Sequence, residues 1–264
     1  MPEGGARGVI AIGRSVAVTT IRIDWAKICR LLQPRKIRST FCMFLDADNM
    51  SQKPPVDSFP LSPMQQGMLF HYLKDPHSGV DIQQLVLHLP EAVDAHRLET
   101  AWQWLVHRHD ILRAKFAWEE AGQLKQEIVS EVLVPFVSKD CRHLSVADQK
   151  AYLQAFFDND RVQGIDVSQA PMMRLNLFQW APTSYSLVWT FQHVLLDGRC
   201  YPILLQQVFD AYAELEKGNI KERPPAYSYR RYIDWLQTRE IAESEAFWKS
   251  FLTGFSAPDR KSVV

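Results

Sequence analysis

The sequence lacks the marks of several protein classes. Its four cysteines are far apart and form no Cys-x-x-Cys pair, so neither a zinc site nor a disulfide framework is indicated. Thirty basic and thirty acidic side chains cancel, which argues against binding to nucleic acid or to an anionic membrane. Charged residues interrupt the apolar stretch at residues 8–23, so it is a poor signal peptide and a poor membrane span. We expect a cytoplasmic protein with reduced thiols and no metal ion.

Apolar residues are plentiful. They make up 47% of the 264 residues, enough to bury a substantial core in one large domain or two small ones. The proline-rich segment SQKPPVDSFP, residues 51–60, is typical of a linker and sets a boundary near Asp57. We therefore divide the chain into an N-terminal extension or linker at residues 1–57, a folded region at 58–258 and a tail at 259–264.

Hydrophobic spacing predicts helices and strands that interleave without strict alternation, which is typical of a mixed α/β (α+β) layered fold. Ser62 and Gln65 have the spacing of a capping box that would begin the first helix, with Met64 among its inward residues. Further helices are expected at residues 95–109, 145–158 and 203–217, with two more between 227 and 255. In the helix at 95–109, the spacing predicts five inward residues: Leu98, Ala101, Trp102, Leu105 and Val106. Strands are expected at residues 8–12, 16–23, 81–89, 173–180 and 184–192, with a hairpin over 111–129 that turns at Ala121 and Gly122.

The stretch TFQHVLLDG, residues 190–198, places a histidine at the end of a strand and an Asp-Gly pair shortly after it. Imidazole exchanges protons near neutral pH, so His193 could act on a reacting amine or alcohol. Asp197 could bond back to it or hold a loop by pairing with an arginine, and Gly198 would permit a tight turn or a close approach. The spacing alone favours a buried histidine that the backbone satisfies, with Asp197 as a helix cap.

The same stretch resembles the His-His-x-x-x-Asp-Gly motif of condensation domains from nonribosomal peptide synthetases, with Gln192 in place of the first histidine. Three further motifs of that family are matched in the same order: LSPMQQGMLFHYL at residues 61–73, HRHDILRAKF at 107–116 and YIDWLQ at 232–237. The resemblance covers residues 58 to 255. It identifies the folded region as similar to the N-terminal lobe of a condensation domain.

This resemblance implies a chloramphenicol-acetyltransferase-like fold, in which two lobes form a V and the motif histidine lies in a tunnel between them. Donor and acceptor would arrive as thioesters on the phosphopantetheine arms of partner carrier domains, and an amide would form. No carrier-domain serine motif is present, so no bound cofactor is expected. The chain stops where the first lobe ends, so we expect a missing second lobe and no activity from this chain alone.

The resemblance also assigns roles to individual residues. His193 matches the catalytic histidine, Asp197 a structural brace, and Gly198 a backbone N–H near the oxyanion. Gln192 can hydrogen-bond but cannot carry a proton at neutral pH. The other positions that match motif residues are expected to support the fold or the tunnel: Gln65, Gly67, His71, Arg113, Tyr232, Asp234 and Trp235. Arg199 and Cys200 could line the tunnel mouth or lie on the surface.

Three functions remain compatible with the sequence. The first is an amide-forming acyltransferase lobe, the second a non-catalytic remnant that docks carrier domains, and the third an ester-forming transferase of the same superfamily. Residues 21–32, IRIDWAKICRLL, faintly resemble the segment after a ketoreductase in modular polyketide synthases. That likeness suggests a remnant of an upstream module, and an unstructured extension or a mis-assigned start codon fits equally well.

Overall fold

A computed structural model describes residues 7–14, 17–24, 54–75, 78–118, 124–224, 226–239 and 241–255. The strands in this part of the chain are β1 (Arg7–Arg14), β2 (Ala17–Asp24), β3 (Asp57–Pro60), β4 (Ile82–Leu89), β5 (Ala114–Trp118), β6 (Leu124–Ile128), β7 (Phe136–Asp140), β8 (Met173–Ala181) and β9 (Ser184–Gln192). The helices are α3 (Pro63–Lys74), α4 (Ala95–Arg108), the 3-10 helix η1 (Asp110–Arg113), α5 (Val146–Gln163), α6 (Cys200–Glu216), α7 (Arg230–Gln237) and α8 (Ile241–Phe251).

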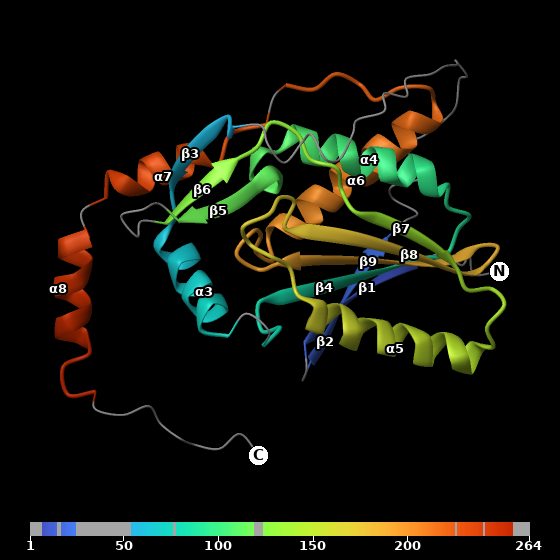
Figure 1. The fold of residues 1–264 in the computed structure, drawn as a ribbon, viewed down its shortest axis with the longest axis horizontal. Coiled ribbons are helices and arrows are strands. Elements are labelled where there is room, and N and C mark those ends of the chain that lie inside the picture. Colours follow the sequence, from blue (N-terminus) through green and yellow to red (C-terminus); the bar gives the residue numbers. More distant parts are fainter. Residues whose placement is uncertain are drawn as a thin grey trace.

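The strands form two sheets, which confirms the mixed α/β expectation. In the described residues the larger sheet has the order β2-β1-β4-β9-β8-β7, and the smaller one has the order β3-β6-β5. Among these strands, only β7 and β8 pair in parallel. Helix α5 covers one face of the larger sheet, and α4 and α6 cover the other (Figure 1).

Strand β9 lies at the centre of the larger sheet, between β4 and β8. All its residues after the first are buried, as expected for a strand covered on both faces. Trp189 packs toward α4, where its ring centroid lies 4.8 Å from that of Trp102. Val188 points the opposite way, into the cluster beneath α5 with Phe178. The burial of both faces fixes the path of β9 and so the place where it ends.

Two helices show how far the sequence pattern predicts local structure. The five inward positions expected for α4 are all buried: Leu98, Ala101, Trp102, Leu105 and Val106. Helix α3 begins with the expected capping box, because Ser62 accepts from the Gln65 backbone N–H while the Gln65 side chain accepts from that of Ser62. The expectation for Met64 was wrong. Its side chain is 70% exposed, since α3 buries a narrow face centred on Leu69.

Other boundaries differ from the expectation. Strand β3 lies within the predicted linker, where its pairing with β6 outweighs the local proline content. Strand β7 was not foreseen, and α5 runs to Gln163, five residues beyond its predicted end. The predicted turn at Ala121 and Gly122 lies outside the described residues. The two strand-like runs near the N-terminus form the β1–β2 hairpin, which pairs along β4.

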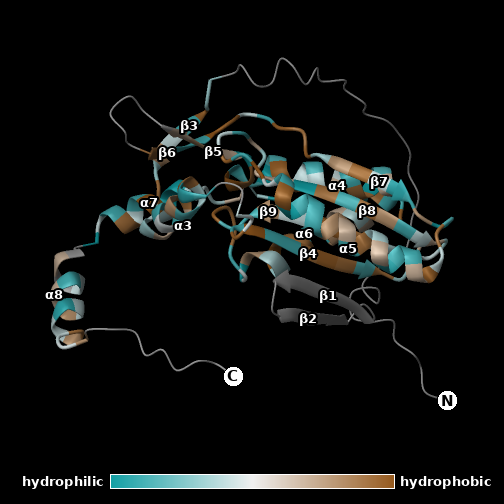
Figure 2. Ribbon diagram, turned by 60° about the horizontal axis from the view of Figure 1, so that its bottom comes forward, coloured by the Kyte–Doolittle hydropathy of each residue, from teal (hydrophilic) through white to brown (hydrophobic). Residues whose placement is uncertain are grey.

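The C-terminal helices differ from the rest of the molecule. Helix α8 extends away from both sheets (Figures 1 and 2). The exposed large apolar residues of α8 and the turn after it are Phe247, Trp248, Phe251, Leu252 and Phe255. Such a patch of aromatic side chains is typical of a surface that packs against another protein segment.

Candidate functional site

His193 directly follows the last residue of β9, and the backbone holds it on two sides. Its backbone N–H donates to the Asp81 carbonyl at 2.8 Å, which continues the ladder between β4 and β9 by one residue. Its imidazole Nδ1 lies 3.0 Å from the Leu196 carbonyl oxygen, and the ring is half-buried. Because a carbonyl can only accept, Nδ1 carries the proton of the neutral ring and Nε2 keeps its lone pair. No hydrogen bond to Nε2 is formed within the described residues.

Asp197 does not bond to His193. Its Oδ1 accepts from the backbone N–H groups of Arg199 and Cys200, at 2.9 and 3.2 Å, and from the Cys200 thiol at 3.2 Å. The thiol contributes most to lowering the pKa of Asp197, the two backbone N–H groups add to it, and partial burial opposes them. Asp197 therefore fixes the turn from β9 into the first turn of α6 through backbone N–H groups and a thiol, and within the described residues it pairs with no arginine side chain.

The next residues of this turn are exposed at Gly198 and Arg199 and half-buried at Cys200. A Cβ placed on Gly198 would meet no atom within 4 Å, so nothing in the described part of this lobe requires a glycine there. Arg199 is exposed, and the Cys200 thiol is half-buried. Burial raises the pKa of Cys200, so its thiol stays protonated at neutral pH and is a poor nucleophile.

Gln192, the neighbour of His193, points to the other face of the sheet because successive residues of a strand alternate. Its side chain is 2% exposed, and its Nε2 donates to the Ile165 carbonyl at 3.1 Å. The residue that takes the place of the family's first histidine is therefore a buried tie between β9 and the segment after α5.

Two predicted supporting residues brace the hairpin of the smaller sheet. Gln65 on α3 is buried, and its amide exchanges hydrogen bonds of 3.2 Å with the fully buried Gln126 on β6. Arg113 donates to the carbonyls of Val106 and His107 at the end of α4 and to the carbonyl of Val129 after β6. Burial lowers the pKa of Arg113, and the nearby Asp110 opposes this.

Three other predicted supporting residues, Gly67, Tyr232 and Asp234, lie on the surface. Gly67 on α3 has open space around the position of a Cβ. Tyr232 and Asp234 on α7 are exposed; the Tyr232 ring stacks on that of Trp235 at 5.9 Å, and Asp234 pairs with Arg230 at 3.5 Å. Asp197 and Cys200 bond to each other in the turn after His193, and neither Tyr232 nor Asp234 has a hydrogen bond to that turn within the described residues.

Sequence reasoning missed Asp81, the residue opposite His193. The register pairs Ile82 with Gln192, and the next pair outward is Asp81 with His193. Burial raises the pKa of Asp81, and the charges of His71 and His193 lower it. Only the register of β4 against β9 reveals this juxtaposition, and a register cannot be read from either strand alone.

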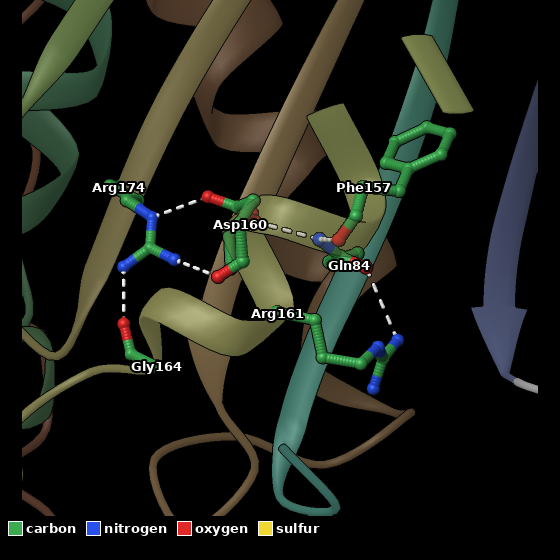
Figure 3. A network of polar contacts seen from close by, with 7 residues as sticks. Gln84, Phe157, Asp160, Arg161, Gly164 and Arg174 are labelled. Atoms are coloured by element: carbon green, nitrogen blue, oxygen red, sulfur yellow. Dashed lines mark hydrogen bonds and ion pairs between the residues drawn. The ribbon is translucent and has the colours of Figure 1, made fainter. Parts of the chain in front are cut away.

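Sequence reasoning also missed a polar network on the opposite face of the sheet (Figure 3). Gln84, Thr190 and Arg174 form one row across β4, β9 and β8. Asp160 of α5 accepts from all three side chains, at 2.7, 2.7 and 2.6 Å, and its carboxylate is almost fully buried. Arg161 adds a bond from its guanidinium to Gln84 at 3.2 Å. The network binds α5 to the end of the sheet from which His193 emerges.

Comparison with known proteins places this arrangement in a family. The family model for the condensation domain matches residues 56–260. The chain belongs to the condensation-domain family. Among its relatives, a linear gramicidin synthase chain of Brevibacillus parabrevis is 39% identical over 198 residues, and bacitracin synthase 1 of Bacillus licheniformis is 35% identical over 199 residues. Each match covers 75% of this chain but only 4% of the relative.

Solved condensation domains have the same fold. The starter condensation domain of rhizomide synthetase superposes with a TM-score of 0.66 at 22% identity, over 76% of this chain and 49% of that one. The first condensation domain of the calcium-dependent antibiotic synthetase, in complex with a substrate analogue, gives a TM-score of 0.69 at 16% identity, over 77% and 50%. The chain thus has the chloramphenicol-acetyltransferase-like fold and spans about half of these solved domains.

None of the helices placed by the structure is both long and apolar enough to cross a bilayer. Within the same residues, no group of three or more His, Cys, Asp or Glu side chains is arranged to hold a metal ion.

Proposed function

We propose that this condensation lobe takes part in amide formation between a carrier-bound acyl or peptidyl donor and a carrier-bound aminoacyl acceptor. His193 carries the proposal. It ends a rigid central strand, its Nδ1–H is directed to the Leu196 carbonyl, and its Nε2 can accept a proton. The family's motif assigns the catalytic role to this histidine, which agrees with the geometry.

His193 acts as the general base or orienting group for the acceptor amine. Holding Nδ1–H on a carbonyl fixes the tautomer and the ring direction, as the second partner of a catalytic histidine commonly does. General-base assistance of this kind contributes roughly 10²–10⁴-fold to the rate. Asp197 keeps the loop in shape, and the Gly198 N–H lies in an open turn from which it can reach a developing oxyanion.

The lobe works with partners. Phosphopantetheine reaches it as part of the loaded carrier domains, in the cytoplasm. A second lobe, supplied by the rest of a longer chain or by a separate chain, completes the tunnel. The coverage of about half of the solved domains supports this, and so do the exposed aromatic side chains of α8. The 264-residue chain alone is therefore inactive.

Reconstitution tests the proposal. The chain is combined with a second condensation lobe and with donor- and acceptor-loaded carrier proteins, and the amide product is quantified by mass spectrometry. Wild type should form amide, the chain alone should not, and His193→Gln should lose at least about 10²-fold of the activity. His96→Gln, at an exposed position on α4, is the matched control and should keep full activity.

Three results would contradict the proposal. Product from hydroxyl but not amine acceptors would favour the ester-forming function, and carrier binding without any product would favour the docking function. A fully active His193→Gln variant would remove the role given to the imidazole.

A further inference from the structure

Asp81 and His193 occupy one cross-strand pair at the open end of the sheet. The His193 N–H bonds to the Asp81 carbonyl at 2.8 Å, and the preceding pair of the same register is Ile82 with Gln192. Side chains of directly opposite residues project from the same face, with Cβ atoms about 5 Å apart. The Asp81 carboxylate and the His193 imidazole therefore stand side by side.

The carboxylate of Asp81 has no structural role in the described part of this lobe. Within the described residues, no hydrogen bond or ion pair reaches it, although the side chain is half-buried. The groups whose charges act on it are His71, on the last turn of α3, and His193, after β9. The structural contribution of this residue comes from its backbone carbonyl, which any amino acid provides.

A half-buried carboxylate without a partner is unfavourable for the fold unless something else uses it. Partial burial strips water from the charged oxygens, and this loss is recovered only when a donor or a cation replaces the water. The pKa of Asp81 reflects this balance, because burial raises it while the positive charges of the two imidazoles lower it. The position favours a small cation that fits beside His193.

We propose that Asp81 binds the ammonium group of the aminoacyl acceptor and holds it beside Nε2 of His193. This inference rests on the proposed function and adds a substrate-binding residue to it. A primary ammonium has three N–H donors, so it can bond to the carboxylate with one and present another to Nε2. Asp81 thus selects amine acceptors and places them at the base.

The proposed step moves two protons away from the acceptor nitrogen. The bound ammonium gives one proton to Nε2 of His193, and the neutral amine attacks the donor thioester carbonyl. The carbon–nitrogen bond forms, the carbon–sulfur bond breaks, and the second proton from nitrogen goes to the leaving thiolate. The Asp81 carboxylate stabilises the imidazolium until that ring releases its proton to water.

The juxtaposition itself is tested without any substrate. The carboxyl ¹³C signal of Asp81 is followed by NMR against pH in the 264-residue chain, and in its His71→Gln and His193→Gln variants. Removal of a positive imidazolium should raise the Asp81 midpoint in each variant, since both charges lower its pKa. An unchanged midpoint in both variants would overturn the inference.

The binding role is tested with two probes. N-alanyl-aminopantetheine has a free amine and an amide in place of the thioester, and N-propionyl-aminopantetheine lacks the amine. Dissociation constants come from the shifts of the His193 ring signals in the 264-residue chain. Wild type should prefer the alanyl probe by about two- to fivefold, the range of a partly exposed charge pair. Asp81→Asn should bind both probes alike.

Asp158→Asn is the control, because it makes the same chemical change at an exposed site on α5 and should keep the preference. A retained preference in Asp81→Asn would overturn the inference, and so would wild-type protein that binds both probes alike or neither. These outcomes leave the proposed function standing, because that is judged by amide formation in the reconstituted system.

Discussion

The two faces of the larger sheet differ sharply at the end of β9. On the α5 face, Thr190 and Gln192 are buried and hydrogen-bonded, and Asp160 gathers donors from three adjacent strands (Figure 3). On the other face, His193 and Asp81 are half-buried, and neither the Nε2 of one nor the carboxylate of the other has a hydrogen-bond partner among the described residues. Residues adjacent in sequence thus belong to very different surroundings.

We interpret the α5 face as the one that stabilises the fold and the opposite face as the one that meets the substrate. A saturated polar network in a dry interior is rigid, and it is costly to break because each lost partner leaves a buried charge or dipole unpaired. Groups that retain unused donors and acceptors at an open edge cost less to replace and can meet a substrate. Contacts on the α5 face fix the position of β9, and His193 remains accessible on the opposite face.

The largest predicted effect is at the centre of the saturated face. Asp160→Ala leaves the Arg174 guanidinium buried without its carboxylate, so it should lower the free energy of unfolding by about 3–5 kcal/mol. Urea unfolding followed by circular dichroism measures this. Asp158→Ala, on the exposed side of the same helix, should change stability by no more than about 0.5 kcal/mol. A loss below about 1 kcal/mol in Asp160→Ala would remove the contrast between the faces.

A smaller effect is predicted for the loop on the open face. Asp197→Ala removes the acceptor for two backbone N–H groups at the start of α6, so it should cost about 1 kcal/mol. Asp197→Asn keeps an acceptor oxygen and should recover part of that loss. Urea unfolding measures the free energy of unfolding of both variants. A cost equal to that of Asp160→Ala would show that the loop is as rigid as the network.

The smallest predicted effect is on the pH dependence of stability, to which Asp197 and Asp81 contribute with opposite signs. The pKa of Asp197 is lowered in the folded state, so its contribution to stability is present above the ordinary value of 3.8 and is lost as pH falls through its folded pKa. The pKa of Asp81 is raised, so the folded state binds its proton first and stability from this group decreases as pH rises from 3.8 through the folded pKa.

Asparagine variants isolate these two contributions. With rising pH through this range, Asp81→Asn should gain stability relative to wild type, and Asp197→Asn should lose it. Unfolding free energies at a series of pH values give both slopes. Slopes of the same sign would contradict the assignment of the two environments.

The sequence predicted the elements better than their contacts. The 3.6-residue spacing of α4 predicted its five buried residues, and the strand expected at residues 184–192 is β9. It failed for β3, because proline near a strand pattern normally indicates a linker and only pairing with β6 shows otherwise. It failed also for the extra turn of α5, which carries Asp160.

The candidate site was predictable in part. The motif indicated His193, and the family resemblance implied a structural role for Asp197, which in the structure accepts from the backbone N–H groups of Arg199 and Cys200 and pairs with no arginine side chain among the described residues. The network of Asp160 with Gln84, Thr190 and Arg174 depends on the registers of three strands, and so does the pair of Asp81 with His193. These residues are far apart in sequence, and no local pattern brings them together.

The most direct test measures both stability and turnover for two neighbouring alanine variants in the reconstituted system. Gln192→Ala should lower the unfolding free energy by about 1–3 kcal/mol, because it leaves the Ile165 carbonyl without its donor, and should affect turnover less. His193→Ala should lower the unfolding free energy by about 1 kcal/mol, because it removes the donor to the Leu196 carbonyl, and should lower turnover by about 10²–10⁴-fold. Equal losses of turnover in the two variants, or a fully active His193→Ala, would contradict the division of β9 into a structural face and a catalytic face.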